Sequence, residues 1–403
     1  MNILYISTVF PKPEDSSTIY TDLAEELTKE NHKVTVVVSE EKKKAPHTKL
    51  SQERGMEVLR VATGNLYDVN IIEKGFTILM MQYQFKSAIK EHLKKKKFDL
   101  VLFESPPVTT ASVVKWAMDY FNCPSYLMLK DIFPQNALDI GVLTKKHPAY
   151  AYFKYKEKKL YQTASIIGTM SEANLQYVRT HNPEVASNKV KLFPNTKKIK
   201  PFTDVLKSRD FRGSHNIPET AVLAVYGGNM GKPQGMDFVC EILISNKENA
   251  EVFFLLVGRG TEREKIAECI KDNGINNAIL LNSLPREEYE EMLNEAGIGL
   301  VFLDQRFTIP NFPSRVLSYF EKKIPVLAAI DKNTDFGQML QESKSGDYSI
   351  AGDLEDFNKK INFLIKNKDV RVAMGEAGYK YLVNNYNVEH SVKLLEEHLT
   401  SIK

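Results

Sequence analysis

A glycine-rich turn between an apolar run and a helical pattern constrains this chain more than any other feature. Residues 221–226 read as a buried strand, glycines follow at Gly227, Gly228 and Gly231, and a helical pattern opens straight after them. Such a turn directs unpaired backbone N–H groups and the positive end of a helix dipole at one point, which suits a phosphate. An ordinary tight turn needs the same glycines, because glycine adopts φ > 0 without strain. The turn alone leaves both interpretations open.

A second strand-to-helix element lies further along the chain. Residues 296–303 read as a fully buried strand, and residues 312–320 open a helix with Pro313 suited to its first turn. Another buried strand is expected at residues 324–329. Two helix N-termini at the carboxyl edge of one parallel sheet would converge on a single anionic ligand. The two elements together favour a phosphate site.

Both halves of the chain alternate short apolar strands with helical patterns, which is typical of parallel sheets covered on both faces. The predicted fold class is α/β, with two tandem Rossmann-like domains whose parallel sheets face a central cleft. We expect an N-terminal domain at 1–197, a polar linker at 198–217 and a C-terminal domain at 218–385. The predicted strands are residues 2–7, 33–38, 99–103, 124–129, 165–169 and 190–193, then 221–226, 252–257, 278–281, 297–303 and 324–329.

Composition agrees with two soluble domains. A chain of 403 residues with 43% hydrophobic content is long enough to bury two cores. No apolar stretch reaches the length of a membrane span, and residues 2–7 form a strand rather than a signal peptide. The three cysteines are widely spaced, which indicates free thiols in a reducing cytoplasm. Asp-x-Asp, Cys-x-x-Cys and paired-histidine patterns are absent from the sequence, so we expect no metal site.

Three motifs in the C-terminal half resemble the nucleotide-sugar domain of glycosyltransferase family 4. They are Gly228-Asn-Met-Gly-x-x-Gln-Gly-Met236, Val257-Gly-Arg-Gly-Thr-Glu-Arg263 and Pro313-Ser-Arg-x-x-Ser-Tyr-Phe320. The subgroup that the chain resembles contains the N-acetyl-L-fucosaminyl transferases of O-antigen and capsule synthesis. The resemblance implies the GT-B fold, in which a final helix, here residues 386–403, packs back on the N-terminal domain.

The resemblance also implies a binding site for a UDP-sugar donor. Many family members carry an arginine and a lysine where this chain has Asn229 and Gln234, and their Glu-x7-Glu element falls on Pro310 and Ser318. We expect Arg315, and less so Lys232, to restore the missing positive charge, although a surface arginine in a first helical turn is the alternative. The expected donor-binding residues are Gly228, Asn229, Gly231, Lys232, Gln234, Gly258, Arg259, Pro313, Ser314 and Ser318.

Two acidic residues in the N-terminal half are candidates for catalysis beside Arg315. Glu104-Ser-Pro-Pro-Val108 and the segment 129–143 are similar to segments that line the acceptor side of the subgroup, and Phe193-Pro-Asn195 resembles the family turn before the linker. Asp131 would orient the acceptor or stabilise charge on the sugar, but a helix N-cap is an equally good interpretation. Glu104, at a comparable strand end, carries the same ambiguity.

The implied reaction is a retaining, metal-independent sugar transfer that uses no cofactor. The expected sugar is an N-acetylated hexosamine such as N-acetyl-L-fucosamine, moved from a UDP-sugar to an undecaprenyl-diphosphate-linked saccharide in capsule or cell-surface polysaccharide synthesis. Two alternatives are a GT-B nucleotide-sugar epimerase and a non-catalytic partner subunit that binds a nucleotide sugar. The missing arginine, lysine and glutamates favour the latter, whereas the acidic and histidine cluster that an epimerase would need is not seen in the motifs.

Charge is distributed unevenly along the chain. Residues 1–200 hold 30 Lys and Arg against 21 Asp and Glu, whereas the remainder holds 24 against 30. Residues 145–161 combine six lysines with four closely spaced aromatics, a composition found in helices at membrane interfaces. We therefore expect a cytoplasmic protein bound peripherally to the inner face of the membrane, with no nucleic-acid partner. Ordinary solvated lysines on a packed helix are the alternative.

Overall fold

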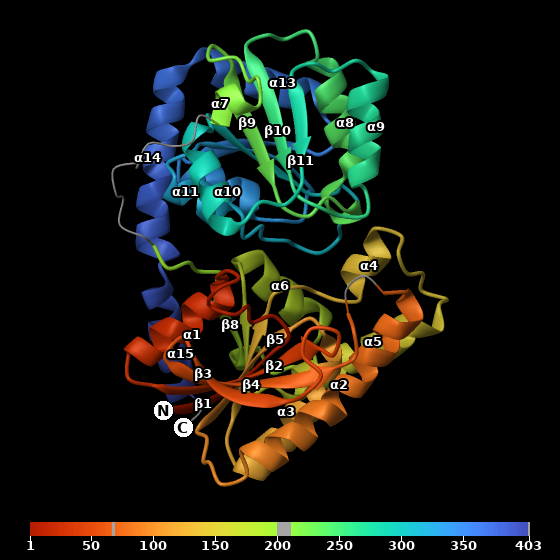
Figure 1. The fold of residues 1–403 in the computed structure, drawn as a ribbon, viewed down its shortest axis with the longest axis vertical. Coiled ribbons are helices and arrows are strands. Elements are labelled where there is room, and N and C mark those ends of the chain that lie inside the picture. Colours follow the sequence, from red (N-terminus) through yellow and green to blue (C-terminus); the bar gives the residue numbers. More distant parts are fainter. Residues whose placement is uncertain (67–68, 200–210, 402–403) are drawn as a thin grey trace. The chain divides into compact units, whose positions relative to one another are not determined.

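The computed structural model describes residues 1–66, 69–199 and 211–401, and the chain divides into two compact units. The N-terminal unit comprises Met1–Lys198 and Val388–Lys403, and the C-terminal unit comprises Ile199–Asn387. Most of the predicted linker, residues 200–210, lies outside the described residues. Both units are α/β, with helices on the two faces of a largely parallel sheet (Figure 1).

An eight-stranded sheet forms the centre of the N-terminal unit, in the order β3-β4-β2-β1-β5-β6-β7-β8. Its central strands are buried on both faces, as expected for parallel strands covered by helices. The strands are β1 Asn2–Ser7, β2 Lys33–Glu41, β3 Lys49–Glu53, β4 Met56–Thr63, β5 Leu100–Ser105, β6 Ser125–Leu129, β7 Ile166–Thr169 and β8 Val190–Leu192.

One strand of this sheet departs from the predicted parallel pattern. β3 pairs antiparallel with β4, and neither strand was predicted from the sequence. Arg54 and Gly55 join them, both with positive φ (52° and 77°), as a two-residue hairpin turn requires. The polar residues of β3 lie at the edge of the sheet, so they lack the apolar run by which the buried strands were recognised.

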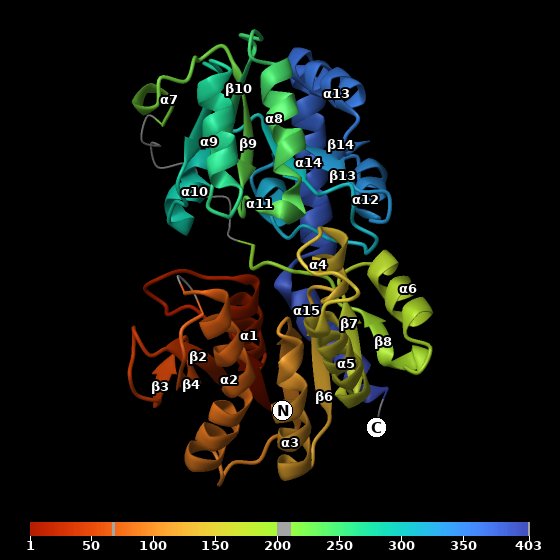
Figure 2. The ribbon, with the colours of Figure 1, turned by 90° about the vertical axis from the view of Figure 1, so that its right-hand side faces the viewer.

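The helices of the N-terminal unit include one from the far end of the chain. They are α1 Ile19–Lys29, α2 Ile71–His92, α3 Ala111–Phe121, α4 Gln135–Asp139, α5 Pro148–Thr163, α6 Glu172–His181 and α15 Val388–Thr400. α15 packs against α1 and buries Val388, Val392, Leu395 and Leu399 in the same core as β1 and β2 (Figure 2). Among the described residues, no helix is both long and apolar enough to cross a membrane.

The C-terminal unit contains a six-stranded parallel sheet in the order β11-β10-β9-β12-β13-β14. The last strand, β14, was not predicted. The strands are β9 Val222–Gly227, β10 Val252–Val257, β11 Ala278–Leu281, β12 Ile298–Phe302, β13 Val326–Ile330 and β14 Gly346–Ile350. The helices are α7 Phe211–Ser214, α8 Met236–Ser245, α9 Arg263–Asp272, α10 Arg286–Met292, α11 Val316–Glu321, α12 Phe336–Glu342, α13 Leu354–Lys366 and α14 Lys368–Asn385.

Each sheet has one point where the strand order reverses. In the N-terminal unit, β2 lies on one side of β1 and β5 on the other, and in the C-terminal unit β10 and β12 flank β9. Ligands of open α/β sheets bind outside the carboxyl ends of the strands at such a switch point. The carboxyl ends of β1, β5 and β9 are therefore where functional side chains are expected to gather.

Candidate functional site

The glycine-rich turn lies at the switch point of the C-terminal unit, directly after β9. Gly228 has φ +138°, and its N–H donates to the carbonyl of Val257 at the end of β10 (2.9 Å). A Cβ on Gly258 would stand 1.9 Å from the Gly228 carbonyl oxygen, and one on Gly260 would stand 2.2 Å from that of Met230. The two glycine turns therefore pack backbone against backbone, which only glycine permits at these positions.

Two predicted donor-binding residues hold the turn in shape. The Gln234 Oε1 atom accepts hydrogen bonds from Asn229 Nδ2 (2.9 Å) and from the backbone N–H of Gly231 (3.1 Å). Lys232 is exposed and opens a 3-10 turn over residues 232–234. The helix expected after the glycine-rich turn is α8, which begins at Met236, directly after Gly235 with φ +58°.

Arg315 lies against this turn from the other side of the switch point. Its guanidinium carbon is 4.5 Å from the ring centre of Tyr226, and its atoms come within 3.2 Å of the place where a Cβ on Gly228 would be. The Nη1 atom is buried and has no hydrogen-bond partner among the described residues. Because arginine stays charged at any physiological pH, this half-buried side chain places a positive charge beside the glycine turn.

Three tyrosines surround Arg315, and the sequence analysis identified none of them as part of the site. Tyr319 donates to the Val225 carbonyl (3.0 Å) and accepts from the N–H of Gly227 (3.3 Å). Tyr289, from α10, lies directly against Gly227. A Cβ on Gly227 would be only 2.0 Å from the Tyr289 hydroxyl oxygen. We call Tyr226, Tyr289 and Tyr319 the tyrosine cluster. No local motif connects residues so far apart in the chain, so only the tertiary structure identifies them.

The helix expected from Phe312 begins later than predicted. Residues 313–315 form a tight turn in which Val316 and Leu317 donate to the carbonyls of Pro313 and Ser314, and α11 runs only over Val316–Glu321. Pro313 is therefore outside the first helical turn, and the N-termini expected at this edge belong to α8 and α11, which begin at Met236 and Val316. Ser318 lies within α11 and is half-buried.

Arg259 follows β10 at the same edge of the sheet. It is exposed, and its Nε atom donates to the Ser283 hydroxyl at 3.0 Å. The carboxyl edge of the C-terminal sheet thus carries the two glycine turns together with the side chains of Arg315 and Arg259. An anion is the ligand that these groups favour.

Glu104 occupies the switch point of the N-terminal unit. Its Oε1 atom accepts from the Ser7 hydroxyl (2.6 Å) and the Thr8 N–H (2.9 Å), both at the end of β1. Its Oε2 atom is buried and has no hydrogen-bond partner within the described part of the chain. Burial raises the pKa of Glu104 to about 7, against the hydrogen bonds that favour the charged form.

Asp131 and Lys130 follow β6 at the same edge. Asp131 accepts from the Asn136 side chain at 2.5 Å through Oδ2, whereas its buried Oδ1 has no partner. α4 begins at Gln135 with Pro134 as N-cap, so the alternative of Asp131 as a helix cap is wrong. Burial raises the pKa of Asp131 to about 6 and lowers the pKa of Lys130 to about 7.

Further buried polar atoms without partners lie at the same edge. They are Ser105 Oγ, after Glu104 on β5, and Asn195 Oδ1, beyond β8. With Glu104 Oε2 and Asp131 Oδ1, four buried oxygens at the carboxyl ends of strands of one sheet have no hydrogen-bond partner among the residues that the structure describes. Since buried polar groups are normally hydrogen-bonded, such a set indicates a polar ligand.

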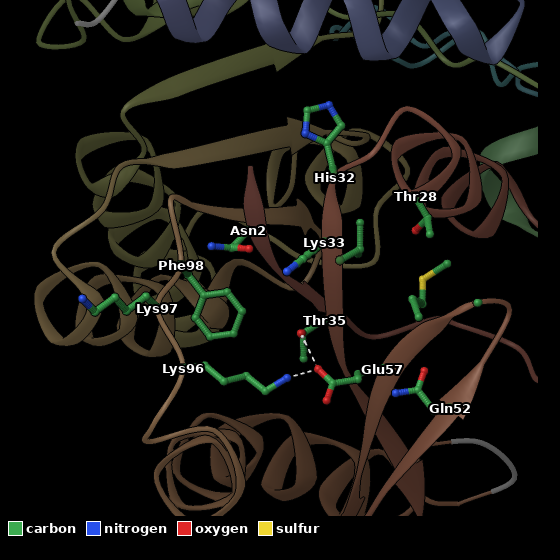
Figure 3. Close-up of a pocket in the computed structure, with 13 residues that line it drawn as sticks. Asn2, Thr28, His32, Lys33, Thr35, Gln52, Glu57, Lys96, Lys97 and Phe98 are labelled. Carbon is green, nitrogen blue, oxygen red and sulfur yellow. Dashed lines mark hydrogen bonds and ion pairs between the residues drawn. The ribbon is translucent and has the colours of Figure 1, made fainter.

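A pocket of about 460 Å³ in the same unit lies at the opposite edge of the sheet (Figure 3). Asn2 and Lys33, the first residues of β1 and β2, line it. Lys96 forms an ion pair with Glu57, which also accepts from the Thr35 hydroxyl (3.1 Å), as the dashed lines of Figure 3 mark. Because it lies at the amino ends of the strands, we do not take it as the functional site.

The basic and aromatic segment 145–161 forms α5 and its preceding turn. Leu160 and Tyr161 are buried, and the Phe153 ring packs edge-on against Phe133 at 5.0 Å. Tyr152 and Tyr155 are exposed, and the ammonium groups of their neighbouring lysines lie over the rings. Two of the four aromatics expected at a membrane make contacts within the unit instead: Phe153 packs against Phe133, and the Tyr150 hydroxyl donates a hydrogen bond to Gln135 Oε1 (3.3 Å).

Groups of His, Cys, Asp and Glu that could hold a metal ion do not occur among residues 1–66, 69–199 and 211–401.

Comparison with known proteins assigns a family to both units. Residues 16–196 match the family model described as Glycosyltransferase Family 4, and residues 207–381 match the model described as Glycosyl transferases group 1. The chain is 22% identical over 290 residues to the probable glycosyltransferase WbjE of Pseudomonas aeruginosa. The aligned region covers 68% of each chain.

Solved structures agree over the full length of the chain. A sucrose-phosphate synthase from Thermosynechococcus elongatus superposes with a TM-score of 0.79 at 15% identity, covering 100% of both chains. HepE of Anabaena, solved in complex with UDP-glucose, superposes with a TM-score of 0.72 at 14% identity and equally complete coverage. At these identities the likeness establishes the fold.

Proposed function

The chain belongs to the glycosyltransferases of GT-B fold, with a family 4 domain followed by a group 1 domain. We propose that it transfers a sugar, with retention of configuration, from a UDP-sugar to a lipid-linked saccharide. The observation that carries the proposal is Arg315, whose buried Nη1 atom has no hydrogen-bond partner among the described residues and whose guanidinium lies against the glycine turn at Gly228. A leaving diphosphate gains negative charge in the transition state, and a preorganised cation stabilises that charge without reorganisation.

The donor site follows from the groups at the carboxyl edge of the C-terminal sheet. Arg315 can bind a phosphate through two N–H groups, and its guanidinium lies against the glycine turn at Gly228. HepE, which shares the fold, is solved with UDP-glucose, and this supports a UDP-sugar as the donor. Asn229 and Gln234 shape the turn through their mutual hydrogen bond and leave the charge to Arg315.

The acceptor site follows from the unsatisfied oxygens of the N-terminal unit. A saccharide offers several hydroxyl donors, and Glu104, Ser105, Asp131 and Asn195 offer buried acceptors. Asp131 would orient the acceptor or stabilise positive charge on the sugar, while the departing phosphate takes the hydroxyl proton. Glu104 would hold a hydroxyl through its unpaired Oε2.

The finer parts of the proposal concern the sugar, the carrier and the location. The donor would carry an N-acetylated hexosamine such as N-acetyl-L-fucosamine, and the acceptor would be attached to undecaprenyl diphosphate in capsule or cell-surface polysaccharide synthesis. The enzyme would work without a metal, in the cytoplasm, on the inner face of the membrane. Support for this location comes from the exposed tyrosines and lysines of α5.

A panel of nucleotide sugars tests the proposal. The full-length protein is incubated with UDP- and other nucleotide-linked sugars, with and without a lipid-linked saccharide, and free UDP and new sugar nucleotides are quantified. Transfer or slow hydrolysis of one UDP-sugar supports the proposal. An epimerised nucleotide sugar would indicate an epimerase, and saturable binding without any turnover would indicate a non-catalytic subunit.

A further inference from the structure

α2 carries a second apolar face that the N-terminal unit does not cover. Phe76 (65% exposed), Leu79 (39%), Met80 (36%) and Tyr83 (63%) follow the spacing i, i+3, i+4, i+7, which places them along one side of the helix. We call these four residues the α2 stripe. The opposite side of α2, with Met81, Phe85 and Ile89, is buried. A helix that packs on its domain with one face needs no second apolar face for stability.

Two exposed aromatics of α5 belong to the same unit. Tyr152 is 37% exposed, and burial, followed by the charge of Tyr83 on α2, raises its pKa. Tyr155 lies one helical turn beyond Tyr152 and is 56% exposed. Both helices pack against α3 within the same unit, and Figure 1 shows α2 on the outer side of the sheet. Exposed apolar patches of this kind mark interaction sites.

Lysines border this surface. Lys156 lies 5.5 Å from the ring centre of Tyr152, and Lys159 lies 5.8 Å from that of Tyr155. Lys154 and Lys158 add further positive charge, although each is paired with a glutamate, at 2.5 Å and 3.3 Å. An apolar face beside ammonium groups matches an anionic lipid bilayer, in which charged headgroups cover the hydrocarbon.

We propose that the α2 stripe, with Tyr152 and Tyr155, inserts into the headgroup region of an anionic membrane. This inference rests on the proposed peripheral location and assigns the inserting element, which is α2 rather than α5 alone. The lysines of α5 supply attraction over a distance, and the stripe supplies the buried apolar area. A second copy of the chain fits less well, because it would bring two lysine-bordered surfaces together.

Vesicle binding tests the stripe directly. The double variant F76S/Y83S is compared with wild type for co-sedimentation with vesicles of phosphatidylcholine and phosphatidylglycerol at low salt. Its partition coefficient should fall about tenfold or more, since roughly 1.4 kcal/mol of lost apolar burial already gives that factor. The matched control is F363S, which removes a phenylalanine of similar exposure (52%) from α13 and should bind as wild type.

A tryptophan placed on the stripe reports insertion independently of affinity. The chain has a single tryptophan, Trp116 on α3, so F76W and F363W are made in a W116F background. With vesicles, the emission of F76W should shift to the blue and be quenched by brominated lipid, whereas F363W should show neither. Bound protein in which F76W stays unquenched, or F76S/Y83S that binds as tightly as wild type, would overturn the inference.

The remaining outcomes also discriminate. If F76S/Y83S abolishes a dimer seen by sedimentation velocity and leaves vesicle binding unchanged, the stripe is a protein interface and the inference fails. Release of UDP from the donor panel, measured without vesicles, tests the transferase separately. A stripe that does not insert therefore leaves the transferase proposal intact, and an inactive protein that still inserts through Phe76 leaves this inference intact.

Discussion

Arg315 is the residue on which donor turnover should depend most. Its Nη1 atom has no hydrogen-bond partner among the described residues, and its guanidinium lies over Tyr226 next to the glycine turn. We predict that R315A lowers donor turnover on the order of 100-fold, as the loss of one preorganised donor to a developing anion does. R315K should recover only part of the rate, because lysine cannot bind a phosphate through a planar fork.

The control for this variant is R306A, since Arg306 is an exposed arginine of the same unit that pairs with Asp304 (2.7 Å). Initial rates of UDP release for the three variants provide the measurement. Turnover by R315A within a few-fold of wild type would contradict the role assigned to Arg315.

Glu104 should leave a signature in the pH dependence of stability. Its pKa of about 7 in the folded protein exceeds its ordinary value of 4.5, so the folded state holds this proton more tightly than the unfolded chain. The free energy of unfolding should therefore fall as pH rises from 4.5 to about 7, by about 3 kcal/mol from this group.

The variant E104Q isolates the effect. Glutamine keeps an acceptor for Ser7 and Thr8 but has no proton to lose, so its stability relative to wild type should increase across this pH range and level off above it. Urea titrations at several pH values up to 7.5 measure the difference. The pKa of Lys130 is lowered from 10.5 to about 7, so Lys130 changes the free energy of unfolding mainly between these two values, above most of this range. A difference that does not change with pH would show that Glu104 stays ionised throughout.

At the scale of elements, the two glycine turns of the C-terminal unit act as one structure. A methyl group on Gly258 would meet the Gly228 carbonyl oxygen at 1.9 Å, so G258A must push the turns apart. We predict loss of donor binding together with a lower unfolding midpoint. G274A is a matched control, because Gly274 also has positive φ (+58°) but nothing lies within 4 Å of its Cβ position.

That control should cost only about 1 kcal/mol, the strain of a left-handed alanine, and keep donor affinity. Calorimetry with UDP and thermal unfolding of both variants measure the two effects. Equal behaviour of G258A and G274A would mean that the contact between the turns is unimportant.

At the scale of the whole molecule, the last helix stabilises the first unit. α15 buries four apolar side chains in the N-terminal core, its Ser391 hydrogen-bonds Thr196 (2.7 Å) and its His398 bonds the Tyr126 hydroxyl (2.8 Å). Each buried aliphatic side chain contributes about 1.5–3 kcal/mol. Truncation after Asn387 should therefore expose the N-terminal unit to protease, whereas truncation after Thr400 should not.

Limited proteolysis with mass spectrometry of the fragments makes the measurement. If cleavage of the variant truncated after Asn387 starts in the C-terminal unit, the result would contradict the assignment of α15 to the N-terminal core.

Catalysis by the whole protein should also be independent of divalent metal. The helix dipoles at the carboxyl edge of the C-terminal sheet and the Arg315 guanidinium are proposed to stabilise the diphosphate in place of a metal ion. Turnover of the donor should be the same in excess EDTA as without it, and added magnesium or manganese should not raise it. Activity lost in EDTA and recovered by either ion would contradict the metal-independent proposal.

The sequence by itself determined those features that depend on local backbone preferences. Buried strands appear as apolar runs, and the glycine turn at Gly228 appears as the φ > 0 positions that only glycine adopts readily. The α/β class and the buried central strands followed from such patterns, whereas the helix expected from Phe312 begins only at Val316, after Arg315. β3 and β14 did not, because their polar residues lack the apolar run.

Only the tertiary structure decided which distant residues act together. Glu104 contacts Ser7 across 97 residues of chain, Tyr289 reaches Gly227 from another helix, and α11 starts at Val316 because a tight turn comes first. The α2 stripe has the same helical spacing as a core face, so the sequence cannot distinguish the two. The difference arises because packing buries one face of the helix and leaves the other in water.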